Sequence, residues 1–542
     1  MVGVAAKPMV QRVASVNDLL DGHSVLEIEC LDRLYLAGYV PRLQTGGQVV
    51  YFMKEHLGNS IPSPAILEKL GNRFRVAVTS FAEANAIPIV RFGRGERKID
   101  AMRPYLDRQA AAGRSGVVAI GVAQEFAPVF AGTRVPSPNE IPWFHYARTD
   151  RRVTCYYFYL WDDEFGPAFI KICAYFPYPM KIWVNGHEWA KRQASKAGIG
   201  FTELSNGFRT CDDPARLQEI CDRLGPGTIR VFAERWWARL PLPFTTADRE
   251  AGFWWDISMR QIETSRTIVF DAPRRARAFF EALVADNLDL GRPDNVEIVF
   301  DRKIRADTAG EFKTAIDRDN DGVTVNVFYK HSRIKQYLKD GRALRIETVV
   351  NDPRDLGVLR RLEHLDELQG KARDANRRLL QTERVGQGCV LASPAFERIA
   401  SPSIEEGQRA PALRFGDPRV MALAGALAMF LHTMTGQVTN KSLRAKVAML
   451  LGTDYSSARM SYDLRRLRMK GIVERVEGTN GYRITPDGIR FAMFYSKIHD
   501  RLLRPLMAAD RPPAPRGLRY ALDELDRYLT IAIRAARLGP AH

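Results

Sequence analysis

The sequence predicts a multidomain α+β protein with an N-terminal α/β domain, a central part built on antiparallel sheet, and a helical C-terminal domain. The chain has 542 residues, which at roughly 150 residues per domain corresponds to three or four domains. Short β-branched and aromatic runs alternate with segments of helical spacing. Hydrophobic residues make up 46% of the chain, which is enough to build folded cores and excludes a disordered protein.

Residues 17–135 form the predicted α/β domain. SVLEIECLDRLYLAGYV is an expected strand, IPIVRF and GVVAIGV are shorter buried strands, and the segment between them has helical spacing. Glu27, Glu29 and Asp32 lie on or just after the first strand, where several metal-dependent nuclease folds carry acidic ligands. A salt-bridged α/β domain is the alternative. The Pro-rich segment 135–142 marks the expected boundary.

Residues 143–294 form the predicted aromatic-rich α+β domain. The run CYYFYLWDDEFGPAFIKICAYFPYPMKIWV is aromatic and β-branched and is interrupted by Asp-Asp-Glu and Gly-Pro, which is typical of a hairpin or meander. Asn185 then caps a predicted helix. Tryptophan beside arginine in FAERWWARLPLPF is suited to stacking on unpaired bases, although core packing is the commoner role of such residues.

Residues 295–388 form a predicted palm-like sheet domain with a long charged helix. NVEIVFDRKI, GVTVNVFYK and GRALRIETVV are its three expected strands, and residues 352–385 are the helix. Arg345 and Glu347 are two positions apart on the third strand, so their side chains point to the same face. We expect them to form a polar cluster with side chains of the neighbouring segment. A structural Arg–Glu ladder on the sheet face is the alternative.

The polar residues of that neighbouring segment are Tyr329, Lys330, Lys335 and Tyr337. The combined pattern, Tyr-Lys followed by Leu-Arg-x-Glu, resembles the end of the palm-like domain in rolling-circle replication initiators of plasmids and phages. The chain has nine histidines but no His-x-His pair, so carboxylate oxygens would supply the metal ligands.

This resemblance implies a role for each polar residue. Glu347 would help to hold a divalent metal, Mg²⁺ or Mn²⁺, with Asp301 as a second ligand at the end of its expected strand. Tyr329 or Tyr337 would be the catalytic nucleophile that attacks a DNA phosphate. The cations that would contact the nucleic acid are Lys330, Lys335 and Arg345.

Residues 416–505 form the predicted C-terminal domain. Asn440 is expected to cap the helix NKSLRAKVAMLLG, and Ser456 or Ser457 is expected to cap the helix SARMSYDLRRLRMKG. A glycine ends each helix. IVERV and YRIT are expected short strands joined by the turn EGTNG. This order of helices followed by strand, wing and strand resembles the winged-helix family of DNA-binding domains.

The helix that precedes the wing is basic on one side. Met460, Leu464 and Leu467 fall at i, i+4 and i+7 and form one buried stripe. The resemblance implies that the basic residues of this helix enter the major groove and that the wing contacts the backbone. The residues concerned are Arg459, Arg465, Arg466, Arg468 and Lys470 on the helix, and Asn480 and Arg483 at the wing. A domain that mediates only protein contacts is the alternative.

Charge favours a polyanionic partner. Lys plus Arg number 80 and Asp plus Glu 63, a net charge of +17, which points to DNA, with RNA as an alternative. The six cysteines include no Cys-x-x-Cys pair, which excludes a zinc knuckle. The most apolar stretch, residues 420–434, is shorter than the ~20 residues that a membrane span needs. We expect a cytoplasmic protein with no membrane partner, and a tail helix in residues 506–542.

The leading hypothesis is a DNA-processing protein of a mobile genetic element, such as a nickase, replication initiator or transposase-like enzyme. The whole chain also resembles a widespread group of large bacterial proteins that travel with mobile elements. The alternatives are a non-enzymatic winged-helix regulator and an RNA-binding or RNA-guided protein. An endonuclease or strand transferase predicts that Glu347, Asp301 and a tyrosine converge in an accessible cleft. A regulator predicts that they are scattered or salt-bridged.

Overall fold

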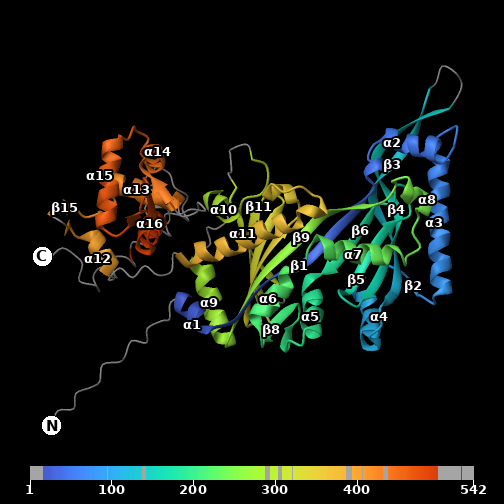
Figure 1. Cartoon of the computed structure of the whole chain (residues 1–542), viewed down its shortest axis with the longest axis horizontal. Coiled ribbons are helices and arrows are strands. Elements are labelled where there is room, and N and C mark those ends of the chain that lie inside the picture. The colour runs from blue at the N-terminus through green and yellow to red at the C-terminus, as the bar shows by residue number, and fades with distance from the viewer. Residues whose placement is uncertain are drawn as a thin grey trace, which may run out of the picture. The chain divides into compact units, whose positions relative to one another are not determined.

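The computed structural model describes residues 16–93, 95–136, 142–286, 293–302, 308–319, 322–385, 394–405, 407–430, 437–498 and 527. These residues divide into two compact units, a larger one over Asp18–Leu380 and a smaller one from Gln381 onward. Both units combine helices with strands (Figure 1), which confirms the mixed α and β class predicted from the sequence. In the described part of the chain, no helix has the length and apolarity that crossing a bilayer requires.

An 11-stranded sheet forms the centre of the larger unit, and its strand order is β10-β11-β12-β13-β9-β1-β6-β5-β4-β3-β2. Neighbouring strands are antiparallel except for β2 and β3, which are parallel. The strands are β1 (Ser24–Tyr39), β2 (Ile89–Arg91), β3 (Gly116–Val135), β4 (Trp143–Asp162), β5 (Gly166–Cys173), β6 (Met180–Asn185), β9 (Asp256–Phe270), β10 (Thr314–Asp319), β11 (Gly322–Tyr329), β12 (Ser332–Lys339) and β13 (Ala343–Val350).

The three segments predicted as separate domains all contribute strands to this one sheet. β1 lies between β9 and β6, so the N-terminal segment pairs on both sides with strands of the second segment. The Pro-rich boundary separates two strands of one hairpin, because β3 and β4 pair from Gly116–Trp161 to Val135–Trp143. The domain limits expected at residues 135–143 and 294–295 therefore do not separate sheets.

Helices and a small hairpin accompany the sheet, and local signals set many of their ends. Ser63 caps α3, with its side chain accepting the Ala65 amide and Pro64 in the first turn. Asn185 caps α5, as predicted. The helices are α1 (Val16–His23), α2 (Gly46–Tyr51), α3 (Pro64–Ala84), α4 (Lys98–Ala112), α5 (Gly186–Lys196), α6 (Pro214–Asp222), α7 (Pro226–Trp237), α8 (Thr246–Glu250), α9 (Pro273–Asp286), α10 (Pro293–Phe300) and α11 (Leu365–Val385), and the hairpin is β7 (Phe201–Leu204) with β8 (Gly207–Cys211).

Opposite faces of the sheet meet different elements, and adjacent residues of β9 show this. Thr264 faces α11, whose Asn376 donates to the Thr264 carbonyl at 3.0 Å. Ser265 points the other way, toward His187 of α5, at 3.1 Å from its Nε2. The site described below lies on the α5 face.

Two expectations about the central segment are wrong in detail. NVEIVFDRKI is not a strand: its apolar run lies in α10, which begins at Pro293. Short apolar runs fit a buried strand and a buried helix equally well, and proline in the first turn favours the helix. The long charged helix also starts later than expected, since two 3-10 turns, Pro353–Leu356 and Leu362–His364, precede α11.

The smaller unit is a helical core with a three-stranded sheet of order β16-β18-β17. Thr439, rather than the expected Asn440, caps α14, and Ser456 caps α15. Gly452 ends α14 in the left-handed conformation. The elements are α12 (Pro394–Ala400), β14 (Ser403–Glu405), β15 (Gln408–Ala410), α13 (Pro418–Phe430), β16 (Gln437–Thr439), α14 (Asn440–Leu451), α15 (Ser457–Met469), β17 (Val473–Arg475), β18 (Gly481–Ile484) and α16 (Pro486–Ile498). The expected tail helix lies outside the described residues, apart from residue 527.

Candidate functional site

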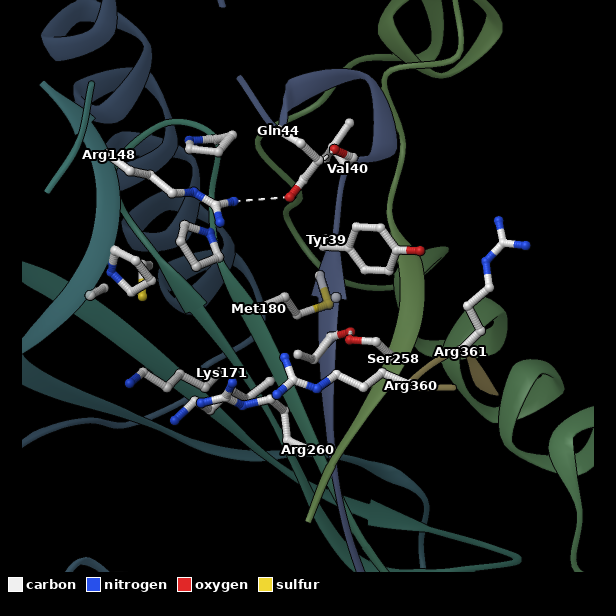
Figure 2. A pocket seen from close by; sticks show the side chains of 18 of the residues that line it. Tyr39, Val40, Gln44, Arg148, Lys171, Met180, Ser258, Arg260, Arg360 and Arg361 are labelled. Atoms are coloured by element: carbon white, nitrogen blue, oxygen red, sulfur yellow. Dashed lines mark hydrogen bonds between the residues drawn. The ribbon is translucent and has the colours of Figure 1, made fainter. Parts of the chain in front are cut away.

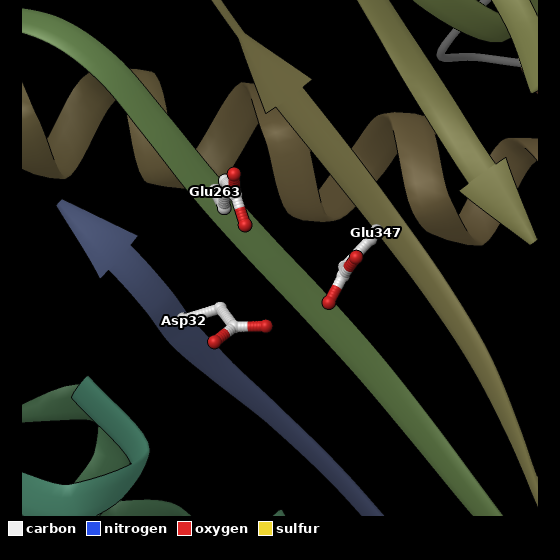
Figure 3. Close-up of side chains that lie close together, drawn as sticks. All are labelled: Asp32, Glu263 and Glu347. Carbon is white, nitrogen blue, oxygen red and sulfur yellow. The ribbon is translucent and has the colours of Figure 1, made fainter. Parts of the chain in front are cut away.

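Three buried carboxylates from neighbouring strands meet on the α5 face of the large sheet. Asp32 of β1, Glu263 of β9 and Glu347 of β13 each have a carboxylate oxygen within 4.8 Å of the other two (Figure 3). A β-bulge explains the convergence: Leu31 pairs with Thr264 and Leu34 with Ile262, so two residues of β1 oppose Glu263 alone. We call Asp32, Glu263, Glu347 and the adjoining Arg345 the charged cluster.

Arg345 supplies the positive charge within this cluster. Its guanidinium is fully buried and donates from Nη2 to Asp32 at 2.6 Å and from Nε to Glu347 at 3.3 Å. Nη1 donates to Thr267 at 2.7 Å, and Nη2 also lies 2.7 Å from Nε2 of His187. Burial alone would lower the pKa of Arg345, but the Asp32 and Glu347 charges raise it above its ordinary value. The guanidinium therefore remains charged in a closed environment.

Both oxygens of the Asp32 carboxylate have hydrogen-bond donors. Besides Arg345, it accepts a hydrogen bond from the Asn206 side chain, which lies between β7 and β8 and is itself held by Asn185 at 3.0 Å. Burial would raise the pKa of Asp32, but the Arg345 charge and these hydrogen bonds hold it below its ordinary value.

Glu263 is the least satisfied member. Its Oε1 accepts from Gln261 at 2.8 Å, whereas Oε2 has no hydrogen-bond donor among the described residues and lies 3.8 Å from Nη1 of Arg33. Burial raises the pKa of Glu263, and the negative charges of Glu347 and Asp32 add to this rise against the opposing Lys335. Its surroundings therefore disfavour the charged form of Glu263.

The donor set only partly fits a metal ion. Three carboxylates within reach of one another suit Mg²⁺ or Mn²⁺, which prefer oxygen ligands. However, Arg345 already forms ion pairs with two of them, and Lys335 lies 3.4 Å from Glu347. A divalent ion would have to compete for these carboxylates with the buried Arg345 guanidinium. If the ion displaced it, the guanidinium would lose its two carboxylate partners.

Tyr337 is a member of this network, whereas Tyr329 and Asp301 are not. The Tyr337 hydroxyl donates to Glu347 at 3.2 Å, and burial, followed by the Glu347 charge, raises its pKa. Tyr329 is 1% exposed, and its ring stacks on Phe300 at 4.9 Å between centroids. Asp301 is exposed, follows α10 rather than a strand, and is not one of the clustered carboxylates.

The three cations predicted to contact nucleic acid in the central segment lie in different surroundings. Lys330 occupies a left-handed turn position after β11, with φ of 53°, and its ammonium lies 5.3 Å from the Tyr329 ring centroid. Lys335 lies beside Glu347, and Arg345 has no exposed surface. As placed, Arg345 cannot touch a phosphate of a bound nucleic acid.

Sequence reasoning found Glu347 and noted Asp32 but missed Glu263. The signal for Glu347 was its spacing from Arg345, which is visible within one strand. Glu263 stands in an ordinary strand sequence, and its importance depends on the bulge in β1, more than 200 residues away. Pairing of β9 with both β1 and β13 brings the three carboxylates together, and no local pattern encodes that pairing.

The exposed face of α15 is a second candidate site. Met460, Leu464 and Leu467 are buried, as predicted from their spacing. The arginines of the helix that are exposed are Arg459, Arg465 and Arg468. None of these three has a carboxylate partner among the described residues. Asn480 and Arg483 are also exposed at the β17–β18 hairpin, where Arg483 pairs with Glu474 at 2.6 Å.

Two of the predicted DNA contacts on α15 instead face the interior of the smaller unit. Arg466 donates from Nε to the Pro411 carbonyl at 3.2 Å and from Nη2 to the Ala412 carbonyl. Lys470 donates to the Ser401 carbonyl and to Ser403 Oγ at 2.6 Å. Both side chains are buried, because they follow the buried Asp463 at i+3 and i+7 on the same side of the helix.

Comparisons with protein-family models, with curated proteins and with solved structures find no match for this chain. The case for function therefore rests on the two sites described above and on the charge of the surfaces around them.

Proposed function

We propose that the protein binds double-stranded DNA through its smaller unit, in the manner of a winged-helix domain. The order of elements supports this proposal: α13, β16, α14, α15, β17 and β18 follow one another as helix, strand, helix, helix, strand and strand. The sheet order β16-β18-β17 places the first strand beside the last, as in that family's arrangement. In such domains the third helix enters the major groove.

The observation that carries the proposal is the unneutralised cationic face of α15. Arg459, Arg465 and Arg468 are exposed around the helix and lack carboxylate partners among the described residues. Guanidinium groups bind phosphate oxygens and the major-groove edge of guanine, often through two parallel hydrogen bonds. Asn440 of α14 donates to Ser461 of α15 at 2.8 Å, which links the two helices.

Binding without strand cleavage has more support than a nickase, replication initiator or transposase-like activity. A tyrosine nucleophile must reach a phosphate, and Tyr329 is enclosed while Tyr337 is bonded to Glu347. Glu347 is bridged to Arg345 and Lys335 rather than open to solvent. The salt bridges of Glu347 and the separate positions of Asp301 and Tyr329 match what we expect of a non-enzymatic DNA-binding protein, including a regulator.

The test is the affinity of the full chain for a labelled duplex, measured by fluorescence anisotropy from about 50 to about 200 mM salt. Simultaneous Arg459→Ala, Arg465→Ala and Arg468→Ala changes should weaken binding by at least about tenfold and reduce the salt slope by about 0.9 per lost phosphate contact. A matched control removes three exposed arginines from the larger unit: Arg103, Arg108 and Arg114.

The control variant should bind the duplex nearly as well as the unmodified protein. Equal losses in both variants would mean that only net charge matters, and no loss in the α15 variant would refute the proposal. A parallel incubation of supercoiled DNA with Mg²⁺ or Mn²⁺ should give no nicking. Metal-dependent nicking that Glu347→Gln or Tyr337→Phe abolishes would establish the enzymatic alternative.

A further inference from the structure

A cavity of about 700 Å³ opens on the large sheet, where side chains of β1, β3, β4, β5, β6 and β9 meet the segment after β13. Lysine and arginine supply seven of its lining side chains, and no carboxylate lines it in the described part of the chain. Figure 2 shows Arg148 and Gln44 on one side of the cavity and Lys171, Arg260 and Arg360 on the other.

A second cavity, of about 430 Å³, adjoins the first. Lys181, Arg260 and Arg360 line both, so the two hollows meet at these three cations. Asp352 lines the second cavity, but both of its oxygens accept hydrogen bonds from Arg360, at 3.0 and 2.6 Å. We call the two hollows together the basic trough.

Positive charge in the basic trough exceeds what the protein neutralises. Lys171 and Lys181 stand directly opposite each other in the β5–β6 pair, an arrangement that costs stability because like charges repel. Glu125 pairs with Lys171, whereas neither Lys181 nor Arg260 has an ion-pair partner among the described residues. Burial, together with the Lys171 and Arg260 charges, lowers the pKa of Lys181. A bound anion would relieve this repulsion.

Aromatic side chains border the same hollow. Phe126 of β3 lines the first cavity and is 74% exposed, so its ring is accessible to a ligand. Tyr39 also lines it, with its hydroxyl 3.2 Å from Asp256. Grooves that bind single strands combine cations that follow the backbone with rings on which bases stack. Cavities of about 300–1,000 Å³ hold small ligands, so the trough has room for a few nucleotides rather than a duplex.

We propose that the basic trough binds single-stranded nucleic acid, with phosphates against Lys181, Arg260 and Arg360 and bases stacked on Phe126 and Tyr39. This site lies wholly within the larger unit and shares no residue with α15. It is therefore a binding activity additional to the proposed duplex contact, and each can fail without the other.

The experiment measures the anisotropy of a labelled oligo-dT of about 12 nucleotides, a length within the site sizes of single-strand binding folds. Lys181→Ala with Arg260→Ala should weaken binding at least about tenfold and reduce the salt slope by about 1.4, which is about 0.7 per cation. Phe126→Ala should weaken it by about tenfold with an unchanged salt slope, since stacking contributes no counterion release.

Three comparisons make the result specific. The α15 triple variant should bind oligo-dT normally, and Arg103→Ala with Arg114→Ala should do the same. An oligo-rU of the same length distinguishes RNA from DNA as the preferred strand. Thermal unfolding of every variant confirms that these exposed substitutions leave the fold intact.

Unchanged oligo-dT affinity in the Lys181→Ala, Arg260→Ala variant would overturn the proposal. It would also be overturned if inorganic tripolyphosphate displaced the oligonucleotide completely at equal phosphate concentration while Phe126→Ala had no effect. That outcome would identify a site for small phosphorylated ligands instead.

Discussion

The charged cluster and the basic trough occupy one sheet and share strands, yet they treat charge in opposite ways. Glu263 and Arg260, only three residues apart on β9, belong to the cluster and to the trough respectively. In the cluster, one buried guanidinium is bonded to two of three buried carboxylates. In the trough, cations gather on an accessible surface with few carboxylates to balance them. The two sites differ in the charge and the burial of the side chains around each charged group, rather than in residue type.

This difference indicates which site is available to a ligand. A ligand at the cluster would have to displace an ion pair from a closed environment, where each uncompensated charge costs several kcal/mol. A ligand at the trough instead adds the charge that is missing there. The catalytic hypothesis depended on residue types, namely carboxylates that could bind a metal and a tyrosine that could attack a phosphate. Such residue types do not define a ligand site when their side chains are buried and bonded to one another.

The largest effect is expected from Arg345→Met. This change leaves Asp32 and Glu347 buried without their counter-ion, so the free energy of unfolding of the larger unit should fall by about 3–5 kcal/mol. Urea denaturation followed by tryptophan fluorescence measures it. Arg260→Met, the matched change in the trough, should alter stability by less than about 0.5 kcal/mol because the side chain is exposed. Similar losses in both variants would erase the proposed distinction.

A smaller effect is expected from Glu125→Gln. This change removes the carboxylate that pairs with Lys171, one of the cations that line the trough. Burial opposes ionisation of Glu125, but hydrogen bonds from Lys171, Lys98 and Tyr157 hold its pKa at about 2, below its ordinary value of 4.5. A lowered pKa stabilises the fold at pH above 4.5, and that contribution is lost as the pH falls toward 2.

Glu125→Gln should therefore lower stability by about 1 kcal/mol at neutral pH, a charged hydrogen bond discounted for partial exposure. The difference from the unmodified protein should shrink steadily in urea titrations below pH 4.5. The same variant should bind oligo-dT about two- to threefold more tightly, because Lys171 loses its carboxylate partner. A pH-independent difference would show that Glu125 acts through packing alone.

The two units also differ in how far the sequence predicts them. In the smaller unit, boundaries depend on residues a few positions apart: Ser456 caps α15, and glycines end α14 and follow α15. These interactions are local, so the limits of α14, α15, β17 and β18 were predicted closely, whereas β14, β15 and β16 were not predicted. The inward turn of Arg466 was missed because it depends on Pro411 and Ala412, which approach from another segment.

In the larger unit the decisive contacts are distant in sequence. Individual strands such as β2 and β13 were predicted from their β-branched runs. Their assembly into one sheet was not, since β1 pairs with β9 and β6 across more than 140 residues. The trough was missed for the same reason: Lys171, Lys181 and Arg260 are unremarkable singly, and only the strand order makes them neighbours.

The smallest effect is expected from adding Mg²⁺ or Mn²⁺, and it bears on whether the cluster is a metal site. A ligand that binds only the folded state raises stability by RT ln(1 + [L]/Kd). Because Arg345 already neutralises Asp32 and Glu347, millimolar metal should leave the melting temperature of the unmodified protein unchanged. In Arg345→Met, Asp32 loses its buried ion-pair partner and Glu347 keeps only Lys335, so metal should restore part of the lost stability, and Glu263→Gln in that background should abolish the rescue. A shift in the unmodified protein that Glu263→Gln removes would instead show that the cluster binds metal with Arg345 in place, and the separation between a closed cluster and an open trough would no longer hold.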